Sequence, residues 1–188
     1  MRKVIYSMTV SLDGYIAGPD GAIDWSAPDE ELFLFHTQRV EDTGVQLCGR
    51  RLYETMLYWE TVEESTLTAE HAKFAKIWKD LPKIVFSTTL ESVAGNSRLV
   101  KDNLGKEVSK LKEQPGKDIA VGGARLAHAC MKLGLIDEWR LFVSPIILGG
   151  GMPCLHPLEK RINMELIETK TFGSRIVYLR YTRLPDTV

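Results

Sequence analysis

The chain has 188 residues, of which 44% are hydrophobic and 26% charged, an ordinary balance for a globular protein with a sizeable core. With 24 basic and 25 acidic residues its net charge is −1, which argues against nucleic acid or a membrane surface as the main partner. No linker, internal repeat or low-complexity segment divides the sequence, so we expect a single domain over residues 1–188.

The N-terminus, the cysteines and the histidines restrict the compartment and the metal chemistry. The chain starts with a polar-flanked strand sequence and contains neither a signal-peptide apolar core nor a bilayer-spanning run. Cys48, Cys130 and Cys154 form no CxxC pair and no metal-ligand cluster. The four histidines are scattered, which favours surface or core positions over catalysis. We predict free thiols, no metal site and a cytoplasmic location.

Strands and helices alternate through the first three quarters of the chain. The helical period is clearest where Phe74, Ile77, Trp78 and Leu81 recur on one face. The predicted elements, in order, are a buried strand at 4–10 with apolar character on both faces, a long loop at 11–27, a helix from about 28 to 43, a strand at 45–48, a helix at 50–56, a helix at 68–81, a strand at 83–86, a short strand ending near 100, a helix at 103–112, a strand at 118–121 and a helix at 125–133.

The pattern changes in the last quarter of the chain. Two apolar segments, 139–143 and 146–148, precede three consecutive glycines. Residues 164–172 and 176–183 are joined by Gly173-Ser174 and predict an antiparallel hairpin. We therefore predict an α/β fold of three layers, with a mostly parallel central sheet, flanking helices and a C-terminal antiparallel hairpin.

Two glycine turns follow apolar strands. Val121-Gly122-Gly123-Ala124-Arg125 leads from a strand into a helix, and Cys48-Gly49-Arg50-Arg51 has the same setting. Glycine lets the backbone approach a ligand closely, and the free N–H groups of a helix start attract an anion. Arginine in a first helical turn opposes the helix dipole unless an anion is present. Ordinary tight turns with solvated arginines are the alternative, but two such turns favour a dinucleotide across the carboxyl ends of parallel strands.

Five segments of the chain, taken in order, resemble the dihydrofolate reductase-like family. They are Ser11-Leu12-Asp13-Gly14-Tyr15-Ile16-Ala17, Gly21-Ala22-Ile23-Asp24-Trp25, Gly49-Arg50-Arg51-Leu52-Tyr53-Glu54, the Gly122-Gly123 turn, and Pro145-Ile146-Ile147-Leu148-Gly149-Gly150-Gly151. They span nearly the whole chain and are most similar to the reductase domain at the C-terminus of bacterial riboflavin-biosynthesis enzymes and to its stand-alone relatives. The resemblance implies this fold and an NADPH-dependent oxidoreductase.

The resemblance also implies a set of contacts to NADPH. Arg50 and Arg51 would bind the 2′-phosphate and the pyrophosphate, since a guanidinium can donate two parallel hydrogen bonds to phosphate. The backbone of Gly122 and Gly123, joined in this family by a cis peptide, would meet the pyrophosphate. The other implied cofactor residues are Gly49, Ser87 and Thr88 on the phosphate side, Val121, Ala124 and Arg125 around the glycine pair, and Ile16 and Ala17 against the nicotinamide, for which plain loop packing is the alternative.

On the substrate side the resemblance points to four residues. Trp25 ends the loop that closes over the nicotinamide, and Glu30, five residues later, is the candidate proton donor. We expect an apolar pocket to raise the pKa of this acid, with Ser144 supporting it. Asp13 is a second catalytic candidate because its loop faces the nicotinamide in the family. Simple helix-dipole stabilisation by Glu30 and an Asx turn at Asp13 are the alternatives.

The reaction implied by the resemblance is hydride transfer to a C=N-type bond of a heterocyclic small molecule. The segments at 11–17 and 145–151 favour a ribosylaminopyrimidine, as in reduction of 5-amino-6-(5-phosphoribosylamino)uracil during riboflavin biosynthesis. A dihydrofolate or dihydropterin substrate and a non-catalytic NADPH-binding module are the alternatives. The HxE and PCxxC signature of a zinc deaminase is absent. We also expect a homodimer that pairs through residues 139–148.

Overall fold

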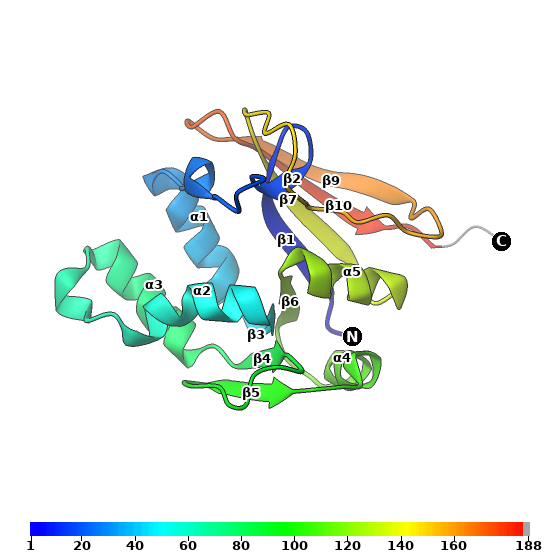
Figure 1. Cartoon of the computed structure of the whole chain (residues 1–188), viewed down its shortest axis with the longest axis horizontal. Helices are drawn as coiled ribbons and strands as arrows, with labels where there is room; N and C mark the ends of the chain where they lie inside the picture. Colours follow the sequence, from blue (N-terminus) through cyan, green and yellow to red (C-terminus); the bar gives the residue numbers. More distant parts are fainter. Residues whose placement is uncertain (186–188) are drawn as a thin grey trace.

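The computed structural model describes residues 1–185, and its centre is an eight-stranded sheet (Figure 1). The strands lie in the order β5 (Ser97–Val100), β4 (Lys83–Phe86), β3 (Thr43–Gly49), β6 (Asp118–Gly122), β1 (Val4–Ser11), β7 (Glu138–Ser144), β10 (Val177–Arg183) and β9 (Met164–Thr171). The first six pair in parallel, whereas β10 is antiparallel to both β7 and β9. The predicted fold class, including the C-terminal hairpin at the sheet edge, is confirmed.

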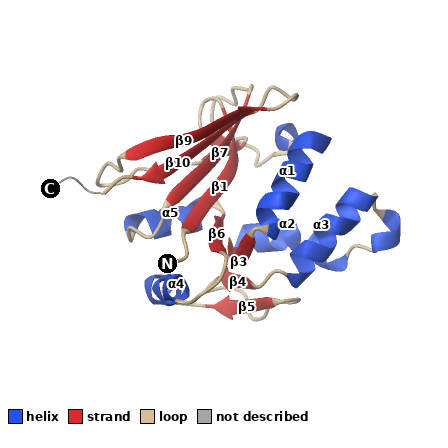
Figure 2. Ribbon diagram, turned by 180° about the vertical axis from the view of Figure 1, so that it is seen from behind, coloured by secondary structure: helices blue, strands red, loops and turns tan. Residues whose placement is uncertain are grey.

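Helices lie on both sides of this sheet. Figures 1 and 2 show α1 (Glu30–Glu41), α2 (Arg50–Thr61) and α3 (Ala69–Asp80) on one side, and α4 (Leu104–Glu113) and α5 (Ala124–Lys132) on the other. The largest cluster of buried side chains packs α4 and α5 against the inner strands, whereas a second cluster packs Leu32 of α1 against Phe142 and Tyr178. In the predicted helical stripe of α3, Phe74, Trp78 and Leu81 are buried and Ile77 is partly buried, as amphipathic periodicity requires.

The segment predicted as one long loop at 11–27 is more structured than its sequence indicates. It contains β2 (Tyr15–Ala17), which pairs antiparallel with β8 (Met152–Pro153), and a 3-10 turn at Asp24–Ser26. Backbone hydrogen bonds from Leu12 N to Ile146 O and from Cys154 N to Gly14 O, both 2.8 Å, extend this pairing. The partners are more than 130 residues apart, so local sequence patterns do not reveal them.

The second half of β1 also differs from the prediction. Ser7, Met8 and Thr9 are only partly buried, so this central strand is not apolar on both faces along its whole length. Val4, Tyr6, Met8 and Val10 belong to or contact the cluster with α4 and α5. Because side chains alternate along a strand, Ser7, Thr9 and Ser11 point to the α1 side. The hydroxyls of Ser7 and Thr9 make no hydrogen bond within residues 1–185.

Helix boundaries shift modestly from the predicted ones. α1 starts at Glu30 because the Asp29 side chain accepts a hydrogen bond from Leu32 N (2.9 Å) and caps the helix. α2 continues to Thr61, one turn or more beyond the predicted end, and the short 3-10 turn Glu64–Thr66 then leads towards α3. α5 ends before Gly134, whose φ of 68° is typical of a helix C-terminal glycine.

The segment expected to form a dimer interface, 139–148, is largely covered by the chain itself. Trp139 and Phe142 are 3% and 0% exposed, and residues 146–148 do not form a strand. Ile147, at 69% exposure, is the clearest apolar group of this segment left open. The homodimer stays a prediction.

Candidate active site

The two glycine turns lie side by side at the carboxyl edge of the sheet. β3 and β6 are neighbours, and their register sets Cys48 opposite Gly122. A Cβ on Gly122 would collide with the end of the Leu52 side chain, which comes from the helix after the other turn. The Cβ position of Gly49 in turn lies 3.8 Å from Leu126 of α5. Each turn is therefore packed against the helix that follows the other one.

The two helices that follow the glycine turns, α2 and α5, have similar N-termini. Their N-cap residues, Gly49 and Gly123, supply no side-chain hydrogen bond, and neither helix has an acid in its first turn. By contrast, Asp29 and Thr68 cap α1 and α3, and α4, which also lacks a side-chain cap, has Glu107 in its first turn. Free N–H groups and the positive end of two helix dipoles therefore face the same edge, an arrangement that suits a pyrophosphate.

The predicted cis peptide between Gly122 and Gly123 is wrong, because the residues that the structure describes contain no cis peptide bond. Gly123 instead has a φ of 94°. Glycine enters this region without steric cost, so the chain can turn from β6 into α5 through a trans peptide. Val121 is buried at the end of β6, and Ala124, also buried, opens the helix.

Arg50 is held by two neighbours at the start of α2. Its Nε lies 2.7 Å from Glu54 Oε1, and its Nη1 donates to Thr89 Oγ1 at 2.9 Å. Ser87 Oγ accepts hydrogen bonds from Thr89 N (3.2 Å) and Leu90 N (3.1 Å) and so shapes the turn that carries Thr89. The hydroxyl that reaches Arg50 therefore belongs to Thr89, which the sequence analysis did not single out.

The other predicted phosphate-side residues are open to solvent. Thr88, Arg51 and Arg125 are exposed, and none of these side chains makes a hydrogen bond or ion pair within residues 1–185. The two arginines stand in the first turns of α2 and α5, where each guanidinium opposes the helix dipole. A bound anion would relieve this cost at both helices.

Asp13 joins the loop before β2 to the glycine-rich loop before β8. Its Oδ1 accepts hydrogen bonds from Ser11 Oγ (2.7 Å) and Leu148 N (3.1 Å), and its Oδ2 accepts one from Gly149 N (2.8 Å). The hydrogen bond from Ser11, followed by those from the two amides, holds the pKa of Asp13 below its ordinary value. This carboxylate is thus an anchor that positions Ile16 and its loop, and its bonds suit an ion rather than a proton donor.

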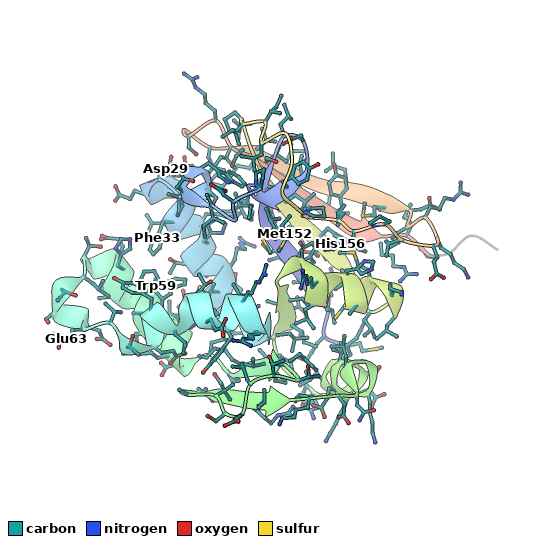
Figure 3. All side chains as sticks on the ribbon, in the orientation of Figure 1. Asp29, Phe33, Trp59, Glu63, Met152 and His156 are labelled. Atoms are coloured by element: carbon teal, nitrogen blue, oxygen red, sulfur yellow. The ribbon has the colours of Figure 1, made fainter. Side chains whose placement is uncertain are left out.

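The three acids at the start of α1 have different environments. Asp29 caps the helix (Figure 3), and Glu31 accepts a hydrogen bond from Gly173 N at 3.1 Å and pairs with Lys170 at 3.2 Å. The Gly173 amide is the main cause that lowers the pKa of Glu31. Glu30 is exposed and makes no hydrogen bond or ion pair within the described chain, so the apolar pocket expected around it is absent.

Trp25 and Ser144, the two residues predicted to contact substrate, each have a buried polar atom without a partner. Trp25 Nε1 and Ser144 Oγ are inaccessible to solvent and make no hydrogen bond with described residues. Ser144 ends β7 opposite Ser11, on the α1 side of the sheet, and Trp25 lies in the turn just before α1. A buried donor or acceptor without a partner costs about 1–3 kcal/mol. Ten side-chain atoms of residues 1–185 are in this state, and these two lie next to the start of α1 and at the carboxyl end of β7, which makes them candidates for contact with a ligand.

His36, which the sequence analysis did not single out as a site residue, also lies in this region. Its ring packs on Phe142 with 4.4 Å between centroids, and Phe142 is the register neighbour of Thr9. The imidazole therefore covers the same face of the sheet that carries Ser7, Thr9 and Ser144. Burial lowers the pKa of His36 from 6.5 to about 4, which keeps the ring neutral at physiological pH. A neutral imidazole both donates and accepts hydrogen bonds.

The neutral state of His36 predicts an acid-sensitive stability. The folded-state pKa lies below the unfolded one, so the unfolded chain binds more protons between pH 6.5 and 4. This contribution to stability is complete above pH 6.5 and is lost as the pH falls towards 4. Between pH 7 and pH 5 the free energy of unfolding of wild type should fall because His36 titrates in the unfolded chain. In His36→Phe, which keeps a ring on Phe142, we expect this fall to be smaller by up to about 2 kcal/mol. Urea unfolding at both pH values measures the difference, and equal losses would contradict the prediction.

Aromatic rings fix the helix that carries His36 relative to the helix that carries Arg50. Phe33 of α1 and Trp59 of α2, labelled in Figure 3, have centroids 6.3 Å apart. Both pack on Phe74 of α3, at 5.5 and 4.7 Å. α3 therefore ties the substrate side of the candidate site to its phosphate side.

Other parts of the described chain offer less to a ligand. An open cavity of about 460 Å³ lies at the opposite edge of the sheet, but its Lys112 and Asp137 are already paired at 2.7 Å. Over residues 1–185, no three His, Cys, Asp or Glu side chains are grouped to hold a metal ion. The described helices include none that could span a membrane. All three cysteines are free and buried.

Comparison with known proteins agrees with this architecture. The model of the RibD C-terminal domain matches residues 2–178. The uncharacterized protein YyaP of Bacillus subtilis strain 168 is 33% identical over 181 residues, which are 96% of this chain and 94% of YyaP. YwjB of the same organism, also uncharacterized, is 32% identical over 187 residues, covering 97% of this chain and 98% of YwjB.

A solved structure of a putative riboflavin biosynthesis protein from Shewanella sp. PV-4 shares the fold, with a TM-score of 0.76 and 24% identity over 97% of this chain and 99% of that one. The deaminase and 5-amino-6-(5-phosphoribosylamino)uracil reductase of Thermotoga maritima matches with a TM-score of 0.67 and 15% identity, over 97% of this chain but 57% of that longer one. At these identities the likeness shows a shared reductase-like fold. The family model, which matches most of the chain, shows more: this protein belongs to the RibD C-terminal domain family.

Proposed function

We propose that this protein is an NADPH-dependent reductase that delivers a hydride to a C=N-type bond of a ribosylaminopyrimidine. The observation that carries the proposal is the pair of helix N-termini, those of α2 and α5, that begin side by side at the carboxyl edge of the sheet with glycine N-caps, no acid and three arginines in their first turns. The part of this edge at the starts of α2 and α5 suits an anion. The part next to α1, at the carboxyl ends of β1 and β7, suits a neutral ring with hydrogen-bonding groups. The family and the name of its Thermotoga maritima relative support the substrate class.

The residues on the phosphate side fit a dinucleotide phosphate. A Cβ on Gly123 would meet nothing within 4 Å, so open space borders the turn into α5, where the first amides of the helix could bind a pyrophosphate. Arg50 and Thr89 would bind the 2′-phosphate, and Arg51 and Arg125 add two unpaired guanidiniums. When bound, NADPH supplies the hydride for the substrate carbon.

The residues on the substrate side fit a neutral heterocycle. Ser7, Thr9 and Ser144 offer hydroxyls that can donate or accept, and His36 offers a neutral imidazole. The loop that Asp13 anchors would hold Ile16 and Ala17 against the nicotinamide. Trp25 would donate its indole N–H to the ligand and exclude water from the reacting atoms. Since Glu30 is exposed, we expect the proton for the substrate nitrogen to come from solvent.

The direct test is NADPH oxidation with 5-amino-6-(5-phosphoribosylamino)uracil and dihydrofolate assayed in parallel. Turnover of the pyrimidine supports the proposal, and turnover of dihydrofolate alone would move the protein to pterin reduction. NADPH binding without reduction of either compound would instead support the non-catalytic binding module. Failure of NADPH to bind would contradict all three functions.

Arg50 gives the proposal a test that needs no substrate. Charge-assisted hydrogen bonds contribute about 1.5–3 kcal/mol each, so we expect Arg50→Ala to weaken NADPH binding about 10- to 100-fold. NADH lacks the 2′-phosphate, and its affinity should change by less than about threefold. Lys73→Ala is the control, because Lys73 forms an exposed ion pair with Glu41 at the far end of α1. Equal losses for the two cofactors would refute the 2′-phosphate assignment.

A further inference from the structure

We propose that Glu54 sets the cofactor preference of this protein, because its carboxylate holds the Arg50 guanidinium that the 2′-phosphate of NADPH needs. Glu54 thereby weakens the binding of NADPH but not that of NADH. The two dissociation constants become more similar, so that NADH can also serve as the cofactor. The inference rests on the proposed function, since it concerns the same phosphate site.

The contact that carries this inference is short and open to solvent. Arg50 Nε and Glu54 Oε1 are 2.7 Å apart, one turn apart on α2, and their side chains are 51% and 42% exposed. Arg50 Nη1 is taken by Thr89 Oγ1, which leaves Nη2 without a partner in residues 1–185. An incoming 2′-phosphate therefore meets a guanidinium whose Nε edge already faces a carboxylate.

Glu54 differs from the other charges next to this pair because it disfavours a bound anion. The first turn of α2 contains no acid, so its dipole and the guanidiniums of Arg50 and Arg51 all favour an anion. Within residues 1–185, Glu54 is the one acidic side chain that pairs with Arg50. The 2′-phosphate carries close to two negative charges, and Glu54 repels it at short range.

The same carboxylate suits the other cofactor. NADH presents a ribose 2′-hydroxyl, which can donate a hydrogen bond to a carboxylate, as acidic residues do in other dinucleotide sites. Glu54 thus offers an acceptor to NADH while Arg50 offers a donor to NADPH. When NADPH binds, either the Arg50–Glu54 ion pair breaks or the Glu54 carboxylate lies close to the 2′-phosphate and repels it. When NADH binds, the ion pair can remain intact.

The test compares the dissociation constants of NADPH and NADH for wild type, Glu54→Gln and a charge-matched control. Glu54→Gln should bind NADPH about two- to fivefold more tightly, and NADH no more tightly than wild type does. Glu41→Gln removes an equally exposed paired carboxylate (44% exposed, 3.7 Å from Lys73) and should change neither constant. The gain of Glu54→Gln should shrink as salt is raised, because both charges are exposed.

The outcomes separate this inference from the function on which it rests. If Glu54→Gln leaves the ratio of the two constants unchanged, or weakens NADPH binding, Glu54 does not oppose the phosphate and the inference fails. The proposed function would still stand if Arg50→Ala weakens NADPH selectively. If the wild-type protein binds neither cofactor, both are overturned.

Discussion

Replacing Gly151 by alanine is expected to destabilise the protein by about 3–4 kcal/mol and to separate the two loops of the candidate site. Gly151 has a φ of 126°, a conformation that alanine adopts only with strain. Its Cβ would also collide with Ala17 O and lie 2.8 Å from Gly18 C, and both are backbone atoms that cannot rotate away. Urea unfolding at equilibrium measures the loss.

The neighbouring glycine supplies a control with the same mutation in the same loop. Gly150 has no positive φ, and its Cβ position lies 3.7 Å from its nearest neighbour, Pro19 Cγ. We expect Gly150→Ala to change the free energy of unfolding by less than about 0.5 kcal/mol. If the two variants are equally stable, Gly151 does not pack directly against the backbone of Ala17 and Gly18. Weaker NADPH binding by Gly151→Ala at a temperature where it is folded would link this packing to the nicotinamide side.

Replacing Glu138 by alanine is expected to cost about 2–3 kcal/mol of stability, because it removes a buried carboxylate that three cations share and leaves Arg140, only 12% exposed, without this partner. Glu138 is 1% exposed and lies 2.7 Å from Arg140, 2.9 Å from Arg180 and 3.3 Å from Lys3. Burial alone would raise the pKa of Glu138, but the hydrogen bond from Arg180 and the charge of Arg140 outweigh it and lower the pKa. Its contribution is therefore present above the ordinary glutamate pKa of 4.5 and is lost as the pH falls below it.

Glu168 provides the matched control for Glu138. It pairs with the same Arg180, at 3.4 Å, but its side chain is 42% exposed. Exposed pairs contribute little, so we expect Glu168→Ala to cost less than about 1 kcal/mol. Thermal unfolding at neutral pH measures the stability of both variants. A similar small loss of stability for each would show that the ion pairs of Glu138 do not stabilise the fold. Glu138 begins β7, at the edge opposite the glycine turns, so neither variant should alter NADPH affinity directly.

Much of the candidate site was predictable because its residues are neighbours in sequence. A strand, a glycine turn and an arginine follow one another in both Cys48-Gly49-Arg50 and Val121-Gly122-Gly123-Ala124-Arg125, so the candidate anion-binding edge can be inferred locally. Thr89 and His36 could not be found this way. Thr89 is identified only by its bond to Arg50, and His36 only by its packing on Phe142.

The sequence by itself determined the alternation of strands and helices, the antiparallel hairpin and the two glycine turns, since each depends on local periodicity and backbone preference. The tertiary structure decided how individual polar groups are used. Asp13 and Glu31 became anchors because distant amides, at Gly149 and Gly173, reach their carboxylates. Glu30 had no such partner and remained exposed. Burial and hydrogen bonding come from contacts between segments far apart in the chain, and they set the charge and the availability of a side chain.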